Sequence, residues 1–125
     1  MFDICKRDID AVNPYEYMPG NASLPVGSAA YMNAGKLTKC TASIKPEYII
    51  MGEPDARLGD PVYPCVKVLD TTYYKTTASG TPTLGTAVTL NASADGVTTT
   101  TASGVFMVTR VNGTAVEGYF VAAKA

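Results

Sequence analysis

The sequence predicts an all-β protein built as a single domain of short antiparallel strands. Three observations carry this prediction. β-Branched and aromatic residues gather in runs that are too short for stable helices, and Gly and Pro separate these runs. The dipeptides Asp95-Gly96 and Asn112-Gly113 stand between pairs of such runs, and both favour tight hairpin turns. The length of 125 residues and the hydrophobic content of 46% suit one domain with its own core.

Residues 1–23 are predicted to form an extended N-terminal arm ahead of a β domain that spans residues 24–125. Prolines interrupt the arm too often for a long regular element. One helical turn over residues 3–10 is expected, because Asp3 could cap it and pair with Arg7. The large apolar side chains of the arm must pack either on its own domain or on a neighbouring subunit. The five candidate contact residues are Phe2, Ile4, Ile9, Tyr15 and Tyr17.

The β domain is predicted to begin with a hairpin over residues 26–40. The runs 26–32 and 36–40 are joined by Asn33-Ala34-Gly35, a turn sequence. In the second run Leu37 faces opposite to Lys36 and Thr38, which is the alternation expected of a strand with one buried and one solvent-exposed face.

Residues 48–69 hold the most apolar pair of predicted strands. Ile49 and Ile50 point to opposite faces of the first strand, so both faces must be covered, by barrel closure, by the arm or by a neighbouring subunit. In the second strand Pro64 cannot donate a hydrogen bond, which predicts a sheet edge or a bulge there.

Residues 71–77 read as another strand, with Tyr73 and Tyr74 among threonines. The wider segment 71–103 holds few large apolar side chains, so we expect much of it to be exposed and mobile. Within it, the runs 86–90 and 97–100 are expected to form a hairpin around Asp95-Gly96.

The last predicted hairpin joins residues 105–111 to residues 114–121 through Asn112-Gly113. With a two-residue turn, Phe106 would lie beside Tyr119. Arg110 would then lie diagonal to Glu117, with both side chains on one face of the hairpin.

Catalytic residue patterns are missing from the sequence. It holds no histidine and neither of the common glycine-rich phosphate-binding motifs, so we expect a protein that is not an enzyme and uses no cofactor. Glu53, Asp55 and Asp60 share one loop and could ligate Ca²⁺, but their spacing matches no EF-hand, which favours a solvated turn without metal. Four tyrosines in predicted strands could stack on sugars, although packing is the commoner role. They are Tyr63, Tyr73, Tyr74 and Tyr119.

Charge and hydropathy patterns argue against nucleic-acid and membrane partners. The net charge is -1 and the ten basic residues are scattered, whereas phosphate binding needs a basic cluster. No apolar run approaches the roughly 20 residues that cross a bilayer. The N-terminus carries acids where a signal peptide would be basic, so cytoplasmic synthesis is expected. Cys5, Cys40 and Cys65 match neither a zinc motif nor a disulfide framework and are expected to be buried thiols.

Several short motifs follow one another in a recognisable order over residues 24–121. They are Leu24–Tyr31 around Gly27, Gly35–Lys39 after a tight turn, Tyr48–Gly52 as an apolar strand ending in Gly, Gly59–Val62 before another β run, and Gly85–Leu90 followed by Asp95-Gly96-Val97 and the last hairpin. This order resembles the small capsid decoration proteins of tailed bacteriophages, also called cement or head-stabilising proteins.

The resemblance implies a small β-barrel or β-tulip-like domain that acts as a structural virion protein. Such a protein binds the major capsid protein on the outer surface of the expanded head, often as a homo-trimer, and stabilises capsomer junctions. On this interpretation the five arm residues named above contact the capsid or another subunit. Two alternatives stay open. A carbohydrate-binding or adhesin-like module would use exposed tyrosines and the acidic loop, and a tail or fibre assembly domain would oligomerise by itself.

Overall fold

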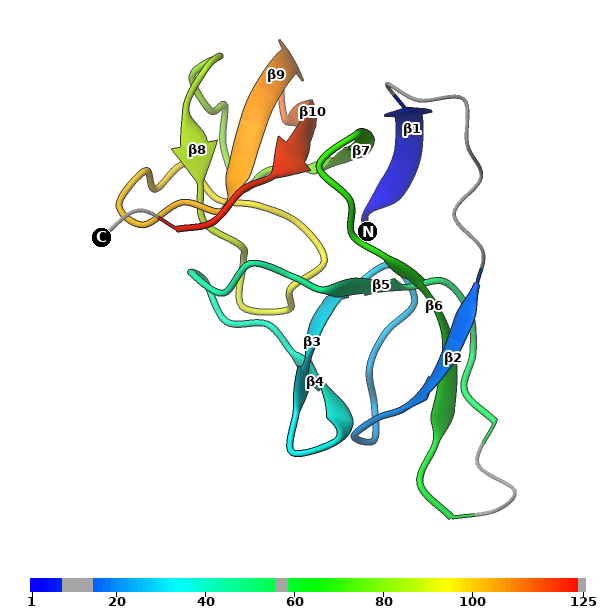
Figure 1. Cartoon of the computed structure of the whole chain (residues 1–125). Helices are drawn as coiled ribbons and strands as arrows, with labels where there is room; N and C mark the ends of the chain where they lie inside the picture. The colour runs from blue at the N-terminus through cyan, green and yellow to red at the C-terminus, as the bar shows by residue number, and fades with distance from the viewer. Residues whose placement is uncertain (8–14, 56–58, 124–125) are drawn as a thin grey trace.

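The structure is a computed structural model that describes residues 1–7, 15–55 and 59–123. All regular secondary structure in these residues is β, without a helix, and its ten strands form two antiparallel sheets of five strands each. The all-β prediction is therefore confirmed. In Figure 1 one sheet lies above the other, with β1 in the upper sheet and β2 in the lower one.

The upper sheet, sheet A, has the strand order β1-β7-β10-β9-β8. Its strands are β1 (Asp3–Arg7), β7 (Thr72–Thr77), β10 (Ala115–Phe120), β9 (Phe106–Asn112) and β8 (Ala87–Val88). Burial alternates along the central strands, so that Tyr74 is buried while Tyr73 and Lys75 are not. Sheet A therefore has one face on the core and one face toward solvent, as expected of an antiparallel sheet.

The lower sheet, sheet B, has the strand order β2-β6-β5-β3-β4. Its strands are β2 (Glu16–Pro19), β6 (Val62–Lys67), β5 (Tyr48–Ile50), β3 (Ala29–Asn33) and β4 (Lys36–Lys39). The sheet curls until Gly20, just after β2, bridges to Leu37 in β4. A Cβ on Gly20 would come within 2.9 Å of the Tyr63 ring, so only glycine permits this approach. The outer strands of sheet B, β2 and β4, are linked by this one bridge and not by a continuous ladder of hydrogen bonds. The expected small barrel is therefore not confirmed in the described residues.

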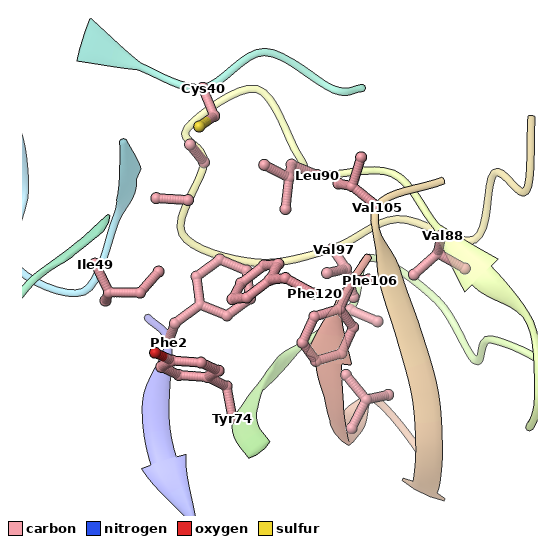
Figure 2. Close-up of a cluster of buried hydrophobic side chains, with 14 of the residues drawn as sticks. Phe2, Cys40, Ile49, Tyr74, Val88, Leu90, Val97, Val105, Phe106 and Phe120 are labelled. Atoms are coloured by element: carbon pink, nitrogen blue, oxygen red, sulfur yellow. The ribbon is translucent and has the colours of Figure 1, made fainter. Parts of the chain in front are cut away.

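Two hydrophobic clusters stabilise the fold. The larger one lies between the sheets, where Phe2, Phe106 and Phe120 pack with ring centroids 5.1 to 5.8 Å apart (Figure 2). The smaller one fills the inside of curled sheet B around Leu37 and Tyr63. Strand β5 serves both, because Ile49 belongs to the first cluster and Ile50 to the second, and both are fully buried. The prediction that both faces of this strand are covered is confirmed.

The N-terminal segment is integrated into both sheets. Residues 3–7 form β1, which pairs with β7, and residues 16–19 form β2, which pairs with β6. The expected helical turn is wrong for residues 3–7, because their backbone hydrogen bonds go to a neighbouring strand; residues 8–10 lie outside the described part. Both strands therefore pack on the chain's own sheets, which is one of the two options expected for the arm.

The prediction for Pro64 is wrong in one respect. Strand β6 is an interior strand, flanked by β2 and β5. Pro64 is tolerated because β5 ends opposite it: the Met51 N–H donates to the Pro64 carbonyl at 2.8 Å, and Pro64 has no N–H to return the bond. The proline therefore limits the length of β5 instead of marking a sheet edge.

Two hairpin predictions can be compared with the strand registers. The first is confirmed, since Asn33 pairs with Lys36 and the turn residues Ala34 and Gly35 both have positive φ. In the last hairpin the predicted register is wrong, because the turn lies at Gly113-Thr114 and Phe106 opposes Phe120 rather than Tyr119. Moving the turn by one residue shifts the pairing by two positions, and a bulge next to Glu117 takes one of these positions back.

The charge pair of the last hairpin keeps its predicted face despite the register shift. Arg110 directly opposes Glu117, so the two side chains lie on the same face as expected. They are direct cross-strand partners and not diagonal ones.

The segment 71–103 is more buried than expected. Leu90, Ala94 and Val97 are almost completely buried in the larger cluster, and Leu90 bridges to Val97 around the predicted turn. The turn is longer than a tight hairpin, and its positive φ lies at Ala94 instead of Asp95. Small side chains suffice here because the loop packs into the space between the sheets.

Candidate functional site

The structure separates the five candidate contact residues into two groups. Phe2 is 1% exposed and lies in the core, and Ile4 is partly buried against the same cluster. Ile9 lies outside the described residues. Tyr15 and Tyr17 are 52% and 68% exposed, which makes them the two candidates that face solvent.

Strand β2 presents Tyr17 outward for a simple geometric reason. It is an edge strand whose side chains alternate, so that Met18 packs against the smaller cluster while Tyr17 points away from it. Tyr17 pairs with Pro64 on β6, and Tyr15 precedes the strand by one residue. The two tyrosines therefore lie next to each other at one edge of sheet B.

A hollow of about 810 Å³ opens beside this edge. Its lining residues are Tyr15, Tyr17, Met51, Gly52, Glu53, Asp55, Asp60, Val62 and Pro64. Gly52 lies against the Pro64 ring, where a Cβ would come within 2.9 Å of Cγ. We call these nine residues the tyrosine hollow. It combines an aromatic wall with apolar and acidic groups.

The acidic loop singled out in the sequence supplies part of this hollow. Asp55 is fixed to β6 by reciprocal backbone hydrogen bonds with Val62, at 2.9 and 2.8 Å. Asp60 forms an ion pair with Lys36 across 3.1 Å, and both side chains are well exposed. Among residues 1–7, 15–55 and 59–123, no group of three or more acidic, Cys or His side chains is placed to hold a metal ion.

Sequence reasoning did not identify the apolar part of the hollow. Met51, Val62 and Pro64 belong to the strand pair predicted over residues 48–69, and their position beside the tyrosines depends on the pairing of β2 with β6. This pairing joins segments that are more than 40 residues apart, and no local sequence pattern predicts it. The one usable signal was Pro64, which marks a place where a sheet is interrupted.

The three thiols are poor nucleophiles. Burial raises the pKa of Cys40 to about 12 and that of Cys65 to about 11. Cys5 is exposed, which corrects the expectation that all three are buried. Its pKa is nevertheless raised to about 11, by partial burial and by Glu117, whose carboxylate accepts a hydrogen bond from Sγ at 3.5 Å. At neutral pH all three therefore remain protonated, whereas the thiolate is the reactive form.

These features define an all-β protein with an exposed aromatic edge and a mixed hollow beside it. No family model, curated protein or solved structure matches the chain. Within the described residues there is no helix of the length and apolar character that a bilayer crossing requires.

Proposed function

We propose that this chain is a structural protein, and not an enzyme, that binds the outer surface of a bacteriophage capsid as a decoration or cement protein. The observation that carries the proposal is the pair of exposed tyrosines, Tyr15 and Tyr17, on an edge strand beside the tyrosine hollow. Tyrosine is enriched in protein interfaces because it buries a large rigid ring at a small cost in conformational entropy.

The partner in this proposal is the major capsid protein at capsomer junctions. A projecting segment of the capsid protein would enter the hollow, with its apolar side chains against Pro64 and Val62 and its polar groups toward Glu53. Many copies, arranged as trimers or other homo-oligomers, would act together, so that weak individual contacts give stable attachment. The chain would be made in the host cytoplasm and reside on the outer capsid surface. The curl of sheet B, joined by the Gly20–Leu37 bridge, supports a barrel-like or β-tulip-like version of the fold.

The test mixes purified expanded heads with the protein and measures bound copies by co-sedimentation, followed by electron microscopy. A Tyr15→Ser/Tyr17→Ser variant should bind about 30-fold or more weakly, because interface tyrosines contribute on the order of 2 kcal/mol or more when buried. The matched control is Leu84→Ser, which removes an apolar side chain that is 62% exposed and does not line the hollow. Equal binding of the double tyrosine variant and the control would refute the proposed contact.

Deletion of residues 1–20 is unsuited to this test. It would remove β1, β2 and the buried Phe2, so a loss of binding would report a damaged fold. The point variants keep the core intact, because both tyrosines are exposed.

Carbohydrate binding is a second candidate function, and the composition of the tyrosine hollow favours it. Exposed aromatic rings and carboxylates occur together there, and sugars stack on rings while their hydroxyl groups donate to carboxylates. The wild type would then bind on a glycan array, the double tyrosine variant would not, and neither protein would bind to heads. This set of results would replace the capsid proposal with carbohydrate binding. Spontaneous assembly into a tube or spike would instead indicate a tail or fibre assembly domain.

A further inference from the structure

The outer face of sheet A carries a row of four charges with alternating sign. Asp3 on β1 opposes Lys75 on β7, which opposes Glu117 on β10, which opposes Arg110 on β9. Direct partners in an antiparallel sheet project from the same face, so these side chains form one line across four neighbouring strands. Lys75 and Arg110 are exposed, and the two acids are partly exposed. We call this line the charged row.

An aromatic row runs parallel to the charged row on the same face. The Lys6 ammonium lies 4.8 Å from the centre of the Tyr73 ring, and Tyr73 meets Tyr119 edge-on with centroids 5.4 Å apart. Met107 opposes Tyr119 and completes the row. Tyr73 and Tyr119 stand two positions from Lys75 and Glu117 along their strands, which places the aromatic row on the same face as the charged row.

The charged row has no internal ion pair in the described residues. Among the described residues, no Lys or Arg nitrogen of the row lies within 4.0 Å of an acidic oxygen of the row, and the ion pairs Lys36–Asp60 and Lys45–Asp70 lie elsewhere. The row therefore presents four charges that an opposing surface can neutralise.

We propose that this face of sheet A binds the same face of a second copy of the chain, related by a two-fold axis that runs along the strands between β7 and β10. This axis reverses the order of the row. Asp3 then meets the partner's Arg110, and Lys75 meets the partner's Glu117, with each contact occurring twice by symmetry. The same rotation sets Tyr73 against the partner's Tyr119, so the aromatic rows also coincide.

The alternating signs select this axis over the competing one. A two-fold axis along the charged row would place each residue against its own copy, so that Lys75 would face the partner's Lys75. Like charges brought together in an interface are strongly disfavoured. The arrangement with reversed rows is the one in which every opposed pair attracts.

The size of the face indicates a weak dimer. Four strands about 4.8 Å apart and roughly five residues of about 3.3 Å each cover on the order of 300 Å². Stable interfaces usually bury about 800 Å² on each partner, so we expect a dissociation constant on the order of 100 µM. The contact goes beyond the proposed capsid function and does not depend on it, because the tyrosine hollow belongs to sheet B.

The test is sedimentation equilibrium of the protein alone, from about 10 µM to 1 mM, at low and high salt. The wild type should approach the mass of a dimer at low salt, and high salt should weaken the association because it screens the charges. Lys75→Glu alone and Glu117→Lys alone should each weaken dimerisation at least tenfold, since each variant places two like-charge contacts in the homodimer. An equimolar mixture of the two variants should dimerise again, because every opposed pair in the heterodimer then attracts.

Controls make each outcome informative. Lys39→Glu changes an exposed lysine on β4 by the same charge and should dimerise like the wild type. Recovery of association in the mixture also demonstrates that both single variants fold, and circular dichroism of each variant checks this independently. Any one of three results would overturn the proposal. The wild type could stay monomeric up to about 1 mM, its limiting mass could be that of a trimer, or the mixture of the two variants could fail to associate.

Discussion

Phe2 offers the most direct test of how the N-terminal segment stabilises the fold. Its ring is 1% exposed and packs against Phe106 and Phe120 with centroid distances of 5.8 and 5.1 Å. Its backbone N–H donates to the Gly27 carbonyl at 2.8 Å, and the Gly27 N–H in turn donates to Ile50 at 2.7 Å. The residue thus links the aromatic core of sheet A to β5 of sheet B.

Phe2→Ala should reduce the free energy of unfolding by about 3 to 5 kcal/mol, the usual cost of removing a buried phenylalanine ring. With a urea m-value of about 1.5 kcal/mol/M for a chain of this size, the unfolding midpoint should fall by roughly 2 to 3 M. Urea denaturation followed by circular dichroism measures this shift.

A loss of no more than about 0.5 kcal/mol, which is the range of surface substitutions, would refute this role of Phe2. It would mean that the first residues do not complete the core. Leu84→Ala is the matched control, because the Leu84 side chain is 62% exposed. This substitution should change the free energy of unfolding by no more than about 0.5 kcal/mol.

Two further predictions concern a turn and the pH dependence. Ala34 has φ of 54° in a hairpin turn, so Ala34→Asn should raise the free energy of unfolding by about 0.5 to 1 kcal/mol, because Asn tolerates this conformation better; an unchanged or lower urea midpoint would contradict this. Burial raises the pKa of Cys40 from 9.0 to about 12, so the folded state keeps a proton that the unfolded state releases. The Cys40 thiol therefore contributes its whole stabilisation below pH 9, and this contribution is lost as the pH rises toward 12. The urea midpoint should fall between pH 9 and pH 11, and it should fall less in Cys40→Ala. An equal fall in the wild type and in Cys40→Ala would exclude the contribution of this thiol.

Local patterns predicted the parts of the fold that depend on neighbours in sequence. The turn at Ala34-Gly35 follows from residues that accept positive φ, and the coverage of Ile49 and Ile50 follows from strand alternation. The final hairpin was located correctly, but its register was not. The register depends on a turn at Gly113-Thr114 and on a bulge next to Glu117, and the Asn-Gly signal specifies neither of them.

Non-local pairing accounts for the features that the sequence did not reveal. Residues 3–7 carry a pattern compatible with a helical turn, yet pairing with β7 and burial of Phe2 make them a strand. The sequence singled out Tyr15, Tyr17 and the acidic loop separately, but it predicted neither the hollow that brings them together nor the apolar part of that hollow. The charged row was not anticipated, because four separate strands each contribute one residue.

The position of β1 has a consequence for how the chain acquires its structure. Arg7 pairs with Thr72, and β7 must itself pair with β10 near the end of the described chain. Contacts between such distant segments form slowly, because long loops must close before any contact stabilises them. During synthesis, Phe2 and β1 cannot reach their native partners until β7 and β10 have been made. We therefore expect folding on the slow side for a domain of this size, with assembly of sheet A as the step that sets the rate.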